Sequence, residues 1–187
     1  MSDRGIVTSE VSIRKAGFGQ IQLLEPLWLA LHGYHANILP TLAGLPIRSA
    51  HDSWTRRRKM YERWLADDAG FVILAEVDDQ VVGYAAIHIE DGLTVWQTGD
   101  YVAFWETMMV LPTAMGKGVG TAITNAVIAE LQGRGITELT GKITEGNGDT
   151  QQFFRNRGGV PINRVLLYRL PAPEDPAVSG DDASSGA

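Results

Sequence analysis

The sequence predicts a single α/β domain built around a mixed sheet. The chain has 187 residues, the length of one ordinary domain, and 44% of them are apolar. Apolar residues recur with a period of about two in some segments and of about 3.6 in others. These segments follow one another as strand, two helices, hairpin, strand, helix, strand, helix and strand, an order typical of a mixed α/β sheet.

The N-terminal part of this pattern is a strand followed by two helices. Residues 11–15 alternate as a short strand, and residues 19–31 have helical spacing with a break expected at Pro26. Residues 32–46 are rich in Gly, Pro and Asn and are therefore expected to form a loop. Asp52 is a candidate cap for the second helix.

The middle of the chain predicts a hairpin and then a third strand. Residues 71–77 and 81–89 have strand patterns and are joined by an Asp-Asp turn. The strand at 101–110 follows, and a glycine-rich turn leads from it into an amphipathic helix that ends at Gly133 or Gly135.

The C-terminal part is predicted to add three short elements. They are a strand at 138–143, a helix at 149–157 and a strand at 165–170. Residues 1–10 are polar and expected to be loose, and residues 171–187 are rich in Pro, Gly, Ser and acids and expected to be disordered.

The glycine turn after the third strand predicts a site for a phosphate group. Gly116, Gly118 and Gly120 precede a helix, whose N-terminus presents free N–H groups and the positive end of the helix dipole. The nucleotide-binding pattern that ends in Gly-Lys-Ser/Thr fails, because a glycine follows Lys117. The dinucleotide pattern fails as well, because Thr121 occupies the position of its third glycine.

Two motifs in this half of the chain resemble the GNAT superfamily of acyl-CoA-dependent N-acyltransferases. The first runs through Val110-Leu111-Pro112 and then Met115-Gly116-Lys117-Gly118-Val119-Gly120. The second consists of Asn147, Thr150, Phe153-Phe154 and Gly158. The resemblance implies one domain over residues 11–170, with a mostly antiparallel sheet and helices on both faces. It also implies a splay between the strands at 101–110 and 138–143.

The resemblance implies acetyl-CoA as co-substrate and transfer of its acetyl group to a primary amine of a small molecule or peptide. Attack is expected to be direct, in a ternary complex. The implied acetyl-CoA contacts are Met108, Met109, Val110, Met115, Gly116, Lys117, Gly118, Val119, Gly120, Thr121, Asn147 and Phe154. Met115 stands where the family usually has Arg or Gln, and Phe154 where many members have a tyrosine that protonates the leaving thiolate.

Glu106 is the candidate general base. It is the one acidic residue in the strand at 101–110, near the position where the family often has a catalytic glutamate. An ammonium substrate must lose a proton before it attacks, and a partly desolvated carboxylate is a suitable acceptor. The alternative is an acid that orients the substrate or has a structural role.

The acceptor amine is expected to bind between the first two helices and the end of this strand. Candidate residues are Tyr34, His35, Trp54 and Trp105. The arginine run at 56–58 is expected to form a solvated helix face.

Composition excludes several other classes of function. Cysteine is absent, so no disulfide or thiolate metal site can form, and the histidines lack metal-ligand spacing; no metal is expected. A net charge of −6 argues against nucleic acid as a partner. With no signal peptide or membrane span in the sequence, we expect a cytoplasmic protein, with a homodimer possible. The alternative function is a non-catalytic acyl-CoA sensor of the same fold, which Met115 and Phe154 favour.

Overall fold

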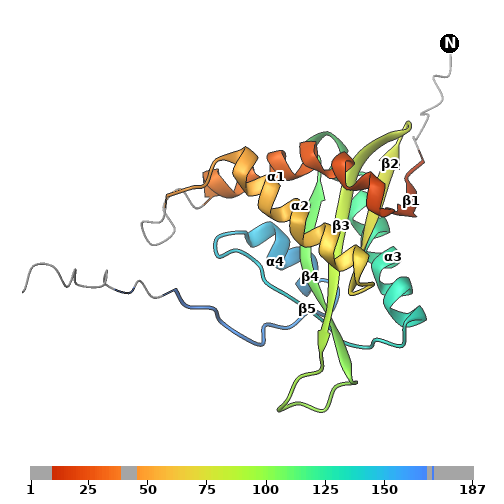
Figure 1. Cartoon of the computed structure of the whole chain (residues 1–187), viewed down its shortest axis with the longest axis vertical. Helices are drawn as coiled ribbons and strands as arrows, with labels where there is room; N and C mark the ends of the chain where they lie inside the picture. Colours follow the sequence, from red (N-terminus) through yellow and green to blue (C-terminus); the bar gives the residue numbers. More distant parts are fainter. Residues whose placement is uncertain (1–9, 39–45, 168–169, 171–187) are drawn as a thin grey trace, which may run out of the picture.

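The protein folds around one five-stranded sheet with the strand order β1-β2-β3-β4-β5 (Figure 1). The computed structural model describes residues 10–38, 46–167 and 170. The strands are β1 (Ser12–Lys15), β2 (Gly70–Val77), β3 (Gln80–Asp91), β4 (Tyr101–Val110) and β5 (Leu139–Gly141). All neighbours are antiparallel except β4 and β5, which are parallel. The predicted mixed, mostly antiparallel sheet is therefore confirmed.

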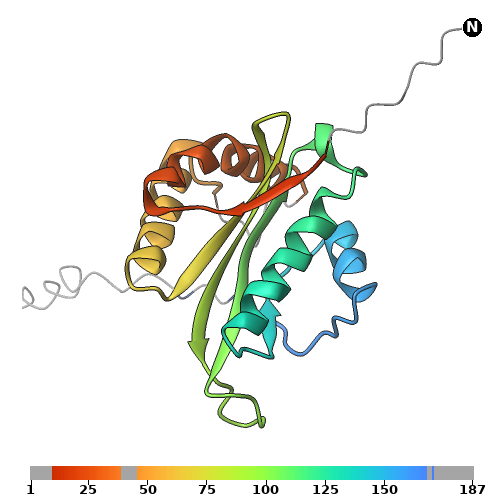
Figure 2. The same ribbon diagram turned by 90° about the vertical axis from the view of Figure 1, so that its right-hand side faces the viewer.

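Helices cover both faces of the sheet (Figure 2). They are η1 (Phe18–Leu24), α1 (Glu25–Ile38), α2 (Ala50–Ala66), η3 (Pro112–Ala114), α3 (Val119–Gly133) and α4 (Gly148–Arg155). Helices α1 and α2 lie on one face, and α3 and α4 lie on the other (Figures 1 and 2). The interior is accordingly divided into two apolar layers, one on each side of the strands.

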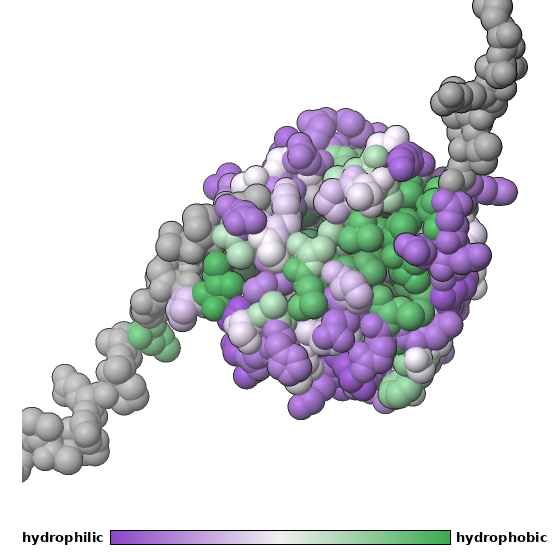
Figure 3. Space-filling model, turned by 90° about the horizontal axis from the view of Figure 1, so that it is seen from above, coloured by the Kyte–Doolittle hydropathy of each residue, from purple (hydrophilic) through white to green (hydrophobic). Residues whose placement is uncertain are grey.

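Each layer is built from alternate residues of the central strands. Leu74 and Tyr84 face α1 and α2, whereas Ile73 and Ile87 face α3. Alternation follows from the period of two along a strand, which sends successive side chains to opposite faces. Some apolar residues lie on the surface. The view from above shows a broad hydrophobic area bordered by hydrophilic residues (Figure 3).

The helix predicted at 19–31 is divided into η1 and α1, and α1 ends later than the sequence pattern indicated. The change from η1 to α1 falls between Leu24 and Glu25, next to the break expected at Pro26, and Pro26 is the second residue of α1, where its missing N–H costs nothing. The loop expected at 32–46 is wrong for residues 32–38, which continue α1; residues 39–45 lie outside the described part. Leu27, Trp28 and Leu31 are buried, and their packing outweighs the helix-weakening composition of residues 32–38.

The regular alternation of side chains along β4 is interrupted halfway along the strand. Residues 86 and 87 of β3 pair with Thr107 and Trp105, so Glu106 is the extra residue of a β-bulge. As a result Trp105 and Met108 face α3, whereas Glu106 and Thr107 both contact α2. The indole N–H of Trp105 donates to the Thr107 carbonyl at 3.1 Å, which keeps that buried oxygen hydrogen-bonded.

The sheet splays apart just at this bulge. Strand β5 pairs only with residues 103–105 of β4, so the rest of β4 has no neighbour on that side among the described residues. The expected splay is present, but β5 is shorter than the predicted 138–143. An open strand edge with free backbone groups results, and it begins next to Glu106.

The strand predicted at 165–170 is not formed by the residues described there, 165–167 and 170. Val165 and Leu166 are exposed, and no described strand lies beside them. Strand propensity alone is insufficient without a partner strand. The expectations for residues 1–9 and 171–187 fall outside the described residues. No helix in the described part is long and apolar enough to cross a membrane.

Candidate active site

Glu106 lies in the bulge, at the point where β4 loses β5 as a neighbour. One carboxylate oxygen, Oε1, forms an ion pair with Nη1 of Arg57 from α2. The other oxygen, Oε2, lies 3.9 Å from Nδ1 of His88 on β3. The side chains of Glu106 and Arg57 are 18% and 19% exposed, so the carboxylate can be reached from outside but is largely shielded from water.

Arg57 is a site residue that the sequence interpretation missed. The expectation that residues 56–58 form one solvated face is wrong, because successive helical residues point in different directions. Arg57 follows Trp54 by three residues and precedes Tyr61 by four, which places it on the buried stripe of α2. Its guanidinium lies 4.5 Å from the Trp28 ring and 5.8 Å from the Tyr61 ring, and both contacts favour the cation. Helical spacing from the two aromatic residues could have identified it.

A cluster of three buried hydroxyl groups, from Tyr61, Tyr84 and Thr107, lies next to the bulge. The Tyr61 hydroxyl donates to Oγ1 of Thr107 at 2.7 Å and lies 3.2 Å from the Tyr84 hydroxyl. Burial raises the pKa of Tyr61 to about 12, so the phenol keeps its proton and remains a donor. This network ties α2 to the residue that follows Glu106.

Replacing Tyr61 with phenylalanine should lower the free energy of unfolding by about 1–2 kcal/mol, because Thr107 would keep a buried hydroxyl without that donor. Urea denaturation would measure the change. Tyr101→Phe is the control, since Tyr101 is exposed and should change stability by no more than about 0.5 kcal/mol. Equal stability of the two variants would show that the cluster does not support the bulge.

The open edge of β4 presents the backbone of Met108 and Val110. The N–H of Leu111 donates to the Val82 carbonyl at 2.8 Å, which fixes the direction of the backbone at the end of β4. Since backbone groups alternate in direction along a strand, those of Met109 also point toward β3. Those of Met108 and Val110 point to the side where β5 has left the sheet. Met108, Met109 and Val110 were all expected to contact acetyl-CoA, and of these three Met108 and Val110 direct their backbone groups to the open edge.

The glycine turn is shaped to receive an anion. Gly116 and Gly118 have φ angles of 74° and 82°, which side chains adopt only with strain, and a Cβ on either would meet nothing within 4 Å. The N–H groups of residues 116–121 have no acceptor among the described residues. They lie at the N-terminus of α3, where the helix dipole favours negative charge. A pyrophosphate fits this donor set, and backbone groups alone supply it.

Helix α4 contributes residues to the rim of the turn. A Cβ on Gly120 would lie 3.4 Å from the Phe153 ring, so Phe153 packs directly against the start of α3. Arg157 lies 3.6 Å from the Phe153 ring and donates to Oγ1 of Thr121 at 2.7 Å. A second cation thus stands beside the turn, in addition to Lys117, whereas the side chain of Met115 is exposed.

Two residues of the second motif have contacts of their own. Phe154 packs edge-on against Trp105, with ring centroids 5.2 Å apart, on the α3 face of the sheet. Asn147 is buried and caps α4 by accepting from the Thr150 N–H at 3.2 Å. Its Oδ1 also accepts from the Tyr34 hydroxyl at 3.3 Å, which connects α1 to α4 across the splay.

The four candidate acceptor residues are not brought together. Tyr34 and His35 lie near the C-terminal end of α1, and Tyr34 is exposed there. Trp54 is 3% exposed and is a core residue between α2 and the sheet. Trp105 is 6% exposed and packs on the opposite face, against Phe154. Of the four, only Tyr34 and His35 lie outside the core, on α1.

His35 should make stability depend on pH. Burial, followed by the charges of His32 and Arg57, lowers the pKa of His35 below its usual 6.5. The unfolded chain then binds the proton more readily than the folded one, so stability falls as pH drops through 6.5 and levels off below the lowered pKa. His35→Gln should flatten this slope in melting temperatures measured across that range, whereas exposed His51→Gln should keep it. Equal slopes in both variants would contradict the assignment.

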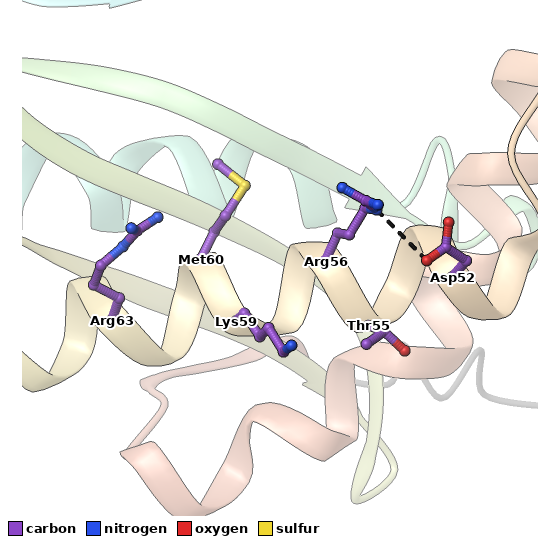
Figure 4. Close-up of a pocket in the computed structure, with 6 residues that line it drawn as sticks. All are labelled: Asp52, Thr55, Arg56, Lys59, Met60 and Arg63. Carbon is purple, nitrogen blue, oxygen red and sulfur yellow. Dashed lines mark ion pairs between the residues drawn. The ribbon is translucent and has the colours of Figure 1, made fainter.

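A separate hollow lies on the outer face of α2 (Figure 4). It is lined by Asp52, Thr55, Arg56, Lys59, Met60 and Arg63. Arg56 pairs there with Asp52 at 3.5 Å, whereas its neighbour Arg57 holds the carboxylate of Glu106. No group of three or more potential ligands in the described part of the chain could hold a metal ion there or elsewhere.

Comparison with known proteins identifies the family of this domain. The profile of the acetyltransferase (GNAT) family matches residues 39–158, which include the glycine turn, Glu106 and α4. The chain belongs to the GNAT family. The resemblance found in the two sequence motifs is therefore confirmed.

Relatives within GNAT are moderately similar in sequence. The L-2,4-diaminobutyric acid acetyltransferase of Nocardia farcinica is 30% identical over 62% of this chain and 61% of that protein. The aminoglycoside N(6')-acetyltransferase type 1 of Klebsiella aerogenes is 28% identical over 57% of this chain and 70% of its own length. The chain thus spans about three fifths of the first of these relatives.

The GNAT fold is also found by comparison of structures. The aminoglycoside N-acetyltransferase AAC(6')-Iy, solved in complex with CoA, superposes with a TM-score of 0.63 at 21% identity. The superposition covers 91% of this chain and 99% of that one. At this identity the likeness shows the fold alone.

Proposed function

We propose that this protein is an N-acetyltransferase that moves an acetyl group from acetyl-CoA to a primary amine of a small molecule or peptide. One arrangement carries the proposal. A row of free N–H groups at residues 116–121 and the open edge of β4 lead to a single carboxylate, Glu106. The turn suits the pyrophosphate of acetyl-CoA, and the open edge suits the extended, amide-bearing arm that joins this pyrophosphate to the thioester. With both in place, the thioester would lie next to the bulge.

The backbone of β4 would position and activate the thioester. An extended arm can pair with the free groups of Met108 and Val110 as an additional strand would. The Met108 N–H is the nearer of the two to Glu106 along the strand, and it would donate to the carbonyl oxygen as negative charge develops there. Met109 points its backbone toward β3, so we assign this role to Met108.

Glu106 would accept the proton of the attacking amine. Arg57 holds Oε1 and thereby fixes the direction of Oε2. The ammonium group of the substrate would enter on the side of β4 that α1 and α2 cover. It would transfer its proton to Oε2, directly or through one water, and the neutral amine would then attack the carbonyl carbon. The nitrogen–carbon bond forms, the carbon–sulfur bond breaks and the CoA thiolate leaves. Phe154 has no proton to give, so solvent would protonate that thiolate.

The acceptor is proposed from chemistry and from the relatives together. One relative is named for L-2,4-diaminobutyric acid, an amino acid with a second amino group, and another for aminoglycosides, which also carry amino groups. The exposed Tyr34 and the carboxylate of Glu106 could bind a cationic small molecule on the α1 and α2 side. L-2,4-diaminobutyric acid and an aminoglycoside are accordingly the first amines to assay.

A thermal-shift titration followed by a thiol-release assay tests the proposal. Acetyl-CoA and CoA should raise the melting temperature, because a ligand that binds only the folded state stabilises it, whereas NAD and ATP should not. Release of CoA thiol should depend on both acetyl-CoA and an amine. Stabilisation by NAD or ATP but not by CoA would refute the proposal. Binding of acetyl-CoA without turnover on a broad amine panel would favour the sensor, which Phe154 makes a real alternative.

A further inference from the structure

The ion pair between Arg57 and Glu106 leaves polar atoms of both side chains without a partner. Nη1 of Arg57 contacts Oε1 of Glu106. Nε and Nη2 of Arg57 have no hydrogen-bond acceptor among the described residues, and Oε2 of Glu106 has no hydrogen-bond donor there. The pair therefore keeps two donor nitrogens and one acceptor oxygen available for a further partner.

These unused atoms can be reached from the surface. In the described part of the chain, Nδ1 of His88 is the one buried side-chain nitrogen or oxygen that lacks a hydrogen-bond partner. Nε and Nη2 of Arg57 and Oε2 of Glu106 lack a partner as well, so they are not among the buried atoms. A small molecule can thus contact the arginine and the carboxylate at the same time.

The guanidinium of Arg57 is held in one orientation. It lies 4.5 Å from the Trp28 ring of α1 and 5.8 Å from the Tyr61 ring of α2, and Glu106 fixes Nη1. Because the group is planar, Nε and Nη2 direct their N–H groups along one edge, which forms a fork for the two oxygens of a carboxylate. A fixed fork without a carboxylate from the described part of the chain suits a carboxylate of the ligand.

The neighbouring charges leave this edge to a ligand. Asp52 and Glu62 of α2 pair with other arginines, so neither competes for Arg57. Burial, followed by the charges of His32 and Arg57, lowers the pKa of His35 below its usual 6.5. His35 is therefore neutral at pH 7 and adds no second cation for the ligand to meet.

We propose that Arg57 binds the carboxylate of the acceptor, and that the acceptor is an amino acid whose reacting ammonium group faces Glu106. The inference rests on the proposed function, in which Glu106 receives the proton of that ammonium group. Glu106 would repel the carboxylate of the ligand, but the ammonium group of the same molecule offsets this repulsion. An aminoglycoside has amino groups and no carboxylate, so it would leave the Arg57 fork unpaired.

Acetyl transfer to matched acids and amides tests this inference. The acids are L-2,4-diaminobutyric acid, ornithine and lysine, and each is compared with its carboxamide, a neutral group of similar shape. For at least one acid, kcat/KM of the wild type should exceed that of its amide about 10- to 100-fold. An aminoglycoside should be used no better than the amides are.

Arg57→Gln tests which residue binds the carboxylate. The variant also releases Glu106, so transfer to acids and to amides should slow together, and the acid-to-amide ratio of kcat/KM should in addition fall toward one. If Arg57 only oriented Glu106, the ratio would not change. Arg57→Lys keeps the charge without the fork; it should lower the ratio by a smaller factor, and it serves where Arg57→Gln does not fold.

Arg56→Gln is the matched control. Arg56 is the adjacent arginine, but it lies on the outer face of α2 and pairs with Asp52 (Figure 4). Its glutamine variant should keep both the rates and the acid-to-amide ratio of the wild type.

The outcomes separate this inference from the proposed function. Wild-type protein that transfers no acetyl group to any amine would overturn both. Transfer by the wild type with acids used no better than their amides, or with the aminoglycoside preferred, would overturn the amino-acid assignment alone, and this comparison requires no variant. A preference for acids that persists in the Arg57 variants would show that another residue binds the carboxylate.

Discussion

Replacing Glu106 with glutamine is expected to lower kcat by about a hundredfold or more, because the amide cannot accept the proton of the attacking amine. Binding of acetyl-CoA should be almost unchanged, since the proposed contacts to it are backbone groups of β4 and of the glycine turn. The loss should therefore be in kcat and in kcat/KM for the amine. Rates should recover in part at high pH, where more of the amine is already neutral. Thiol release measured across a pH series would show both effects.

The control for this variant is Glu76→Gln. Glu76 is also a strand carboxylate paired with an arginine, Arg14, at 2.6 Å, but it lies at the β1–β2 edge, far from the bulge along the sheet. It should retain full activity, and any small loss of stability should match that of Glu106→Gln. An undiminished kcat/KM for Glu106→Gln at every pH would remove this carboxylate from the mechanism.

Placing a negative charge at Gly118 is expected to weaken the binding of acetyl-CoA strongly. Asn and Asp both tolerate a positive φ angle, such as the 82° of Gly118, better than other side chains do. Gly118→Asn and Gly118→Asp should therefore fold alike and differ only in charge. Because the added atoms would point into open space above the N-terminus of α3, where a pyrophosphate would lie, Asp should weaken binding about 10- to 100-fold more than Asn.

Calorimetric titration with CoA would measure this difference, and Gly133→Asp provides the control for net charge. Gly133 is the last residue of the same helix, has open space around its Cβ position and has no positive φ angle. Its aspartate variant should bind CoA like the wild type. Equal CoA affinities for Gly118→Asn and Gly118→Asp would mean that no phosphate lies at this turn.

Local signals in the sequence were enough to predict most of the elements. The hairpin at β2 and β3, the strand β4 and the helix after the glycine turn each combine a clear periodicity with a nearby turn residue. The extension of α1 over residues 32–38 was not predictable in this way, because its glycine and asparagine are typical of loops. Packing of Leu27 and Leu31 against the core decides the outcome there, and composition does not report it.

The site was only partly predictable, for a different reason. The glycine turn and Glu106 lie within one continuous segment, so a motif locates both. Arg57 and His88 come from other elements, and they meet Glu106 only because the β3–β4 register slips at the bulge. The sequence pattern of a strand does not reveal which residue is left unpaired. Trp54 and Trp105 illustrate the converse, since an aromatic residue close to a site in sequence can be a core residue in the fold.

The bulge at Glu106 also decides what a one-codon change in this gene would do. Deleting the codon for residue 106 would restore regular pairing of β4 with β3 and leave Thr107 and Met108 opposite Ala86 and Ala85, on their present faces. The carboxylate would be lost, but the backbone groups of Met108 and Val110 would still point to the open edge. Inserting a codon after residue 107 would instead shift the register and send the later side chains to the opposite face. The length of β4 beyond the bulge should therefore vary less among descendants of this gene than the identity of its side chains.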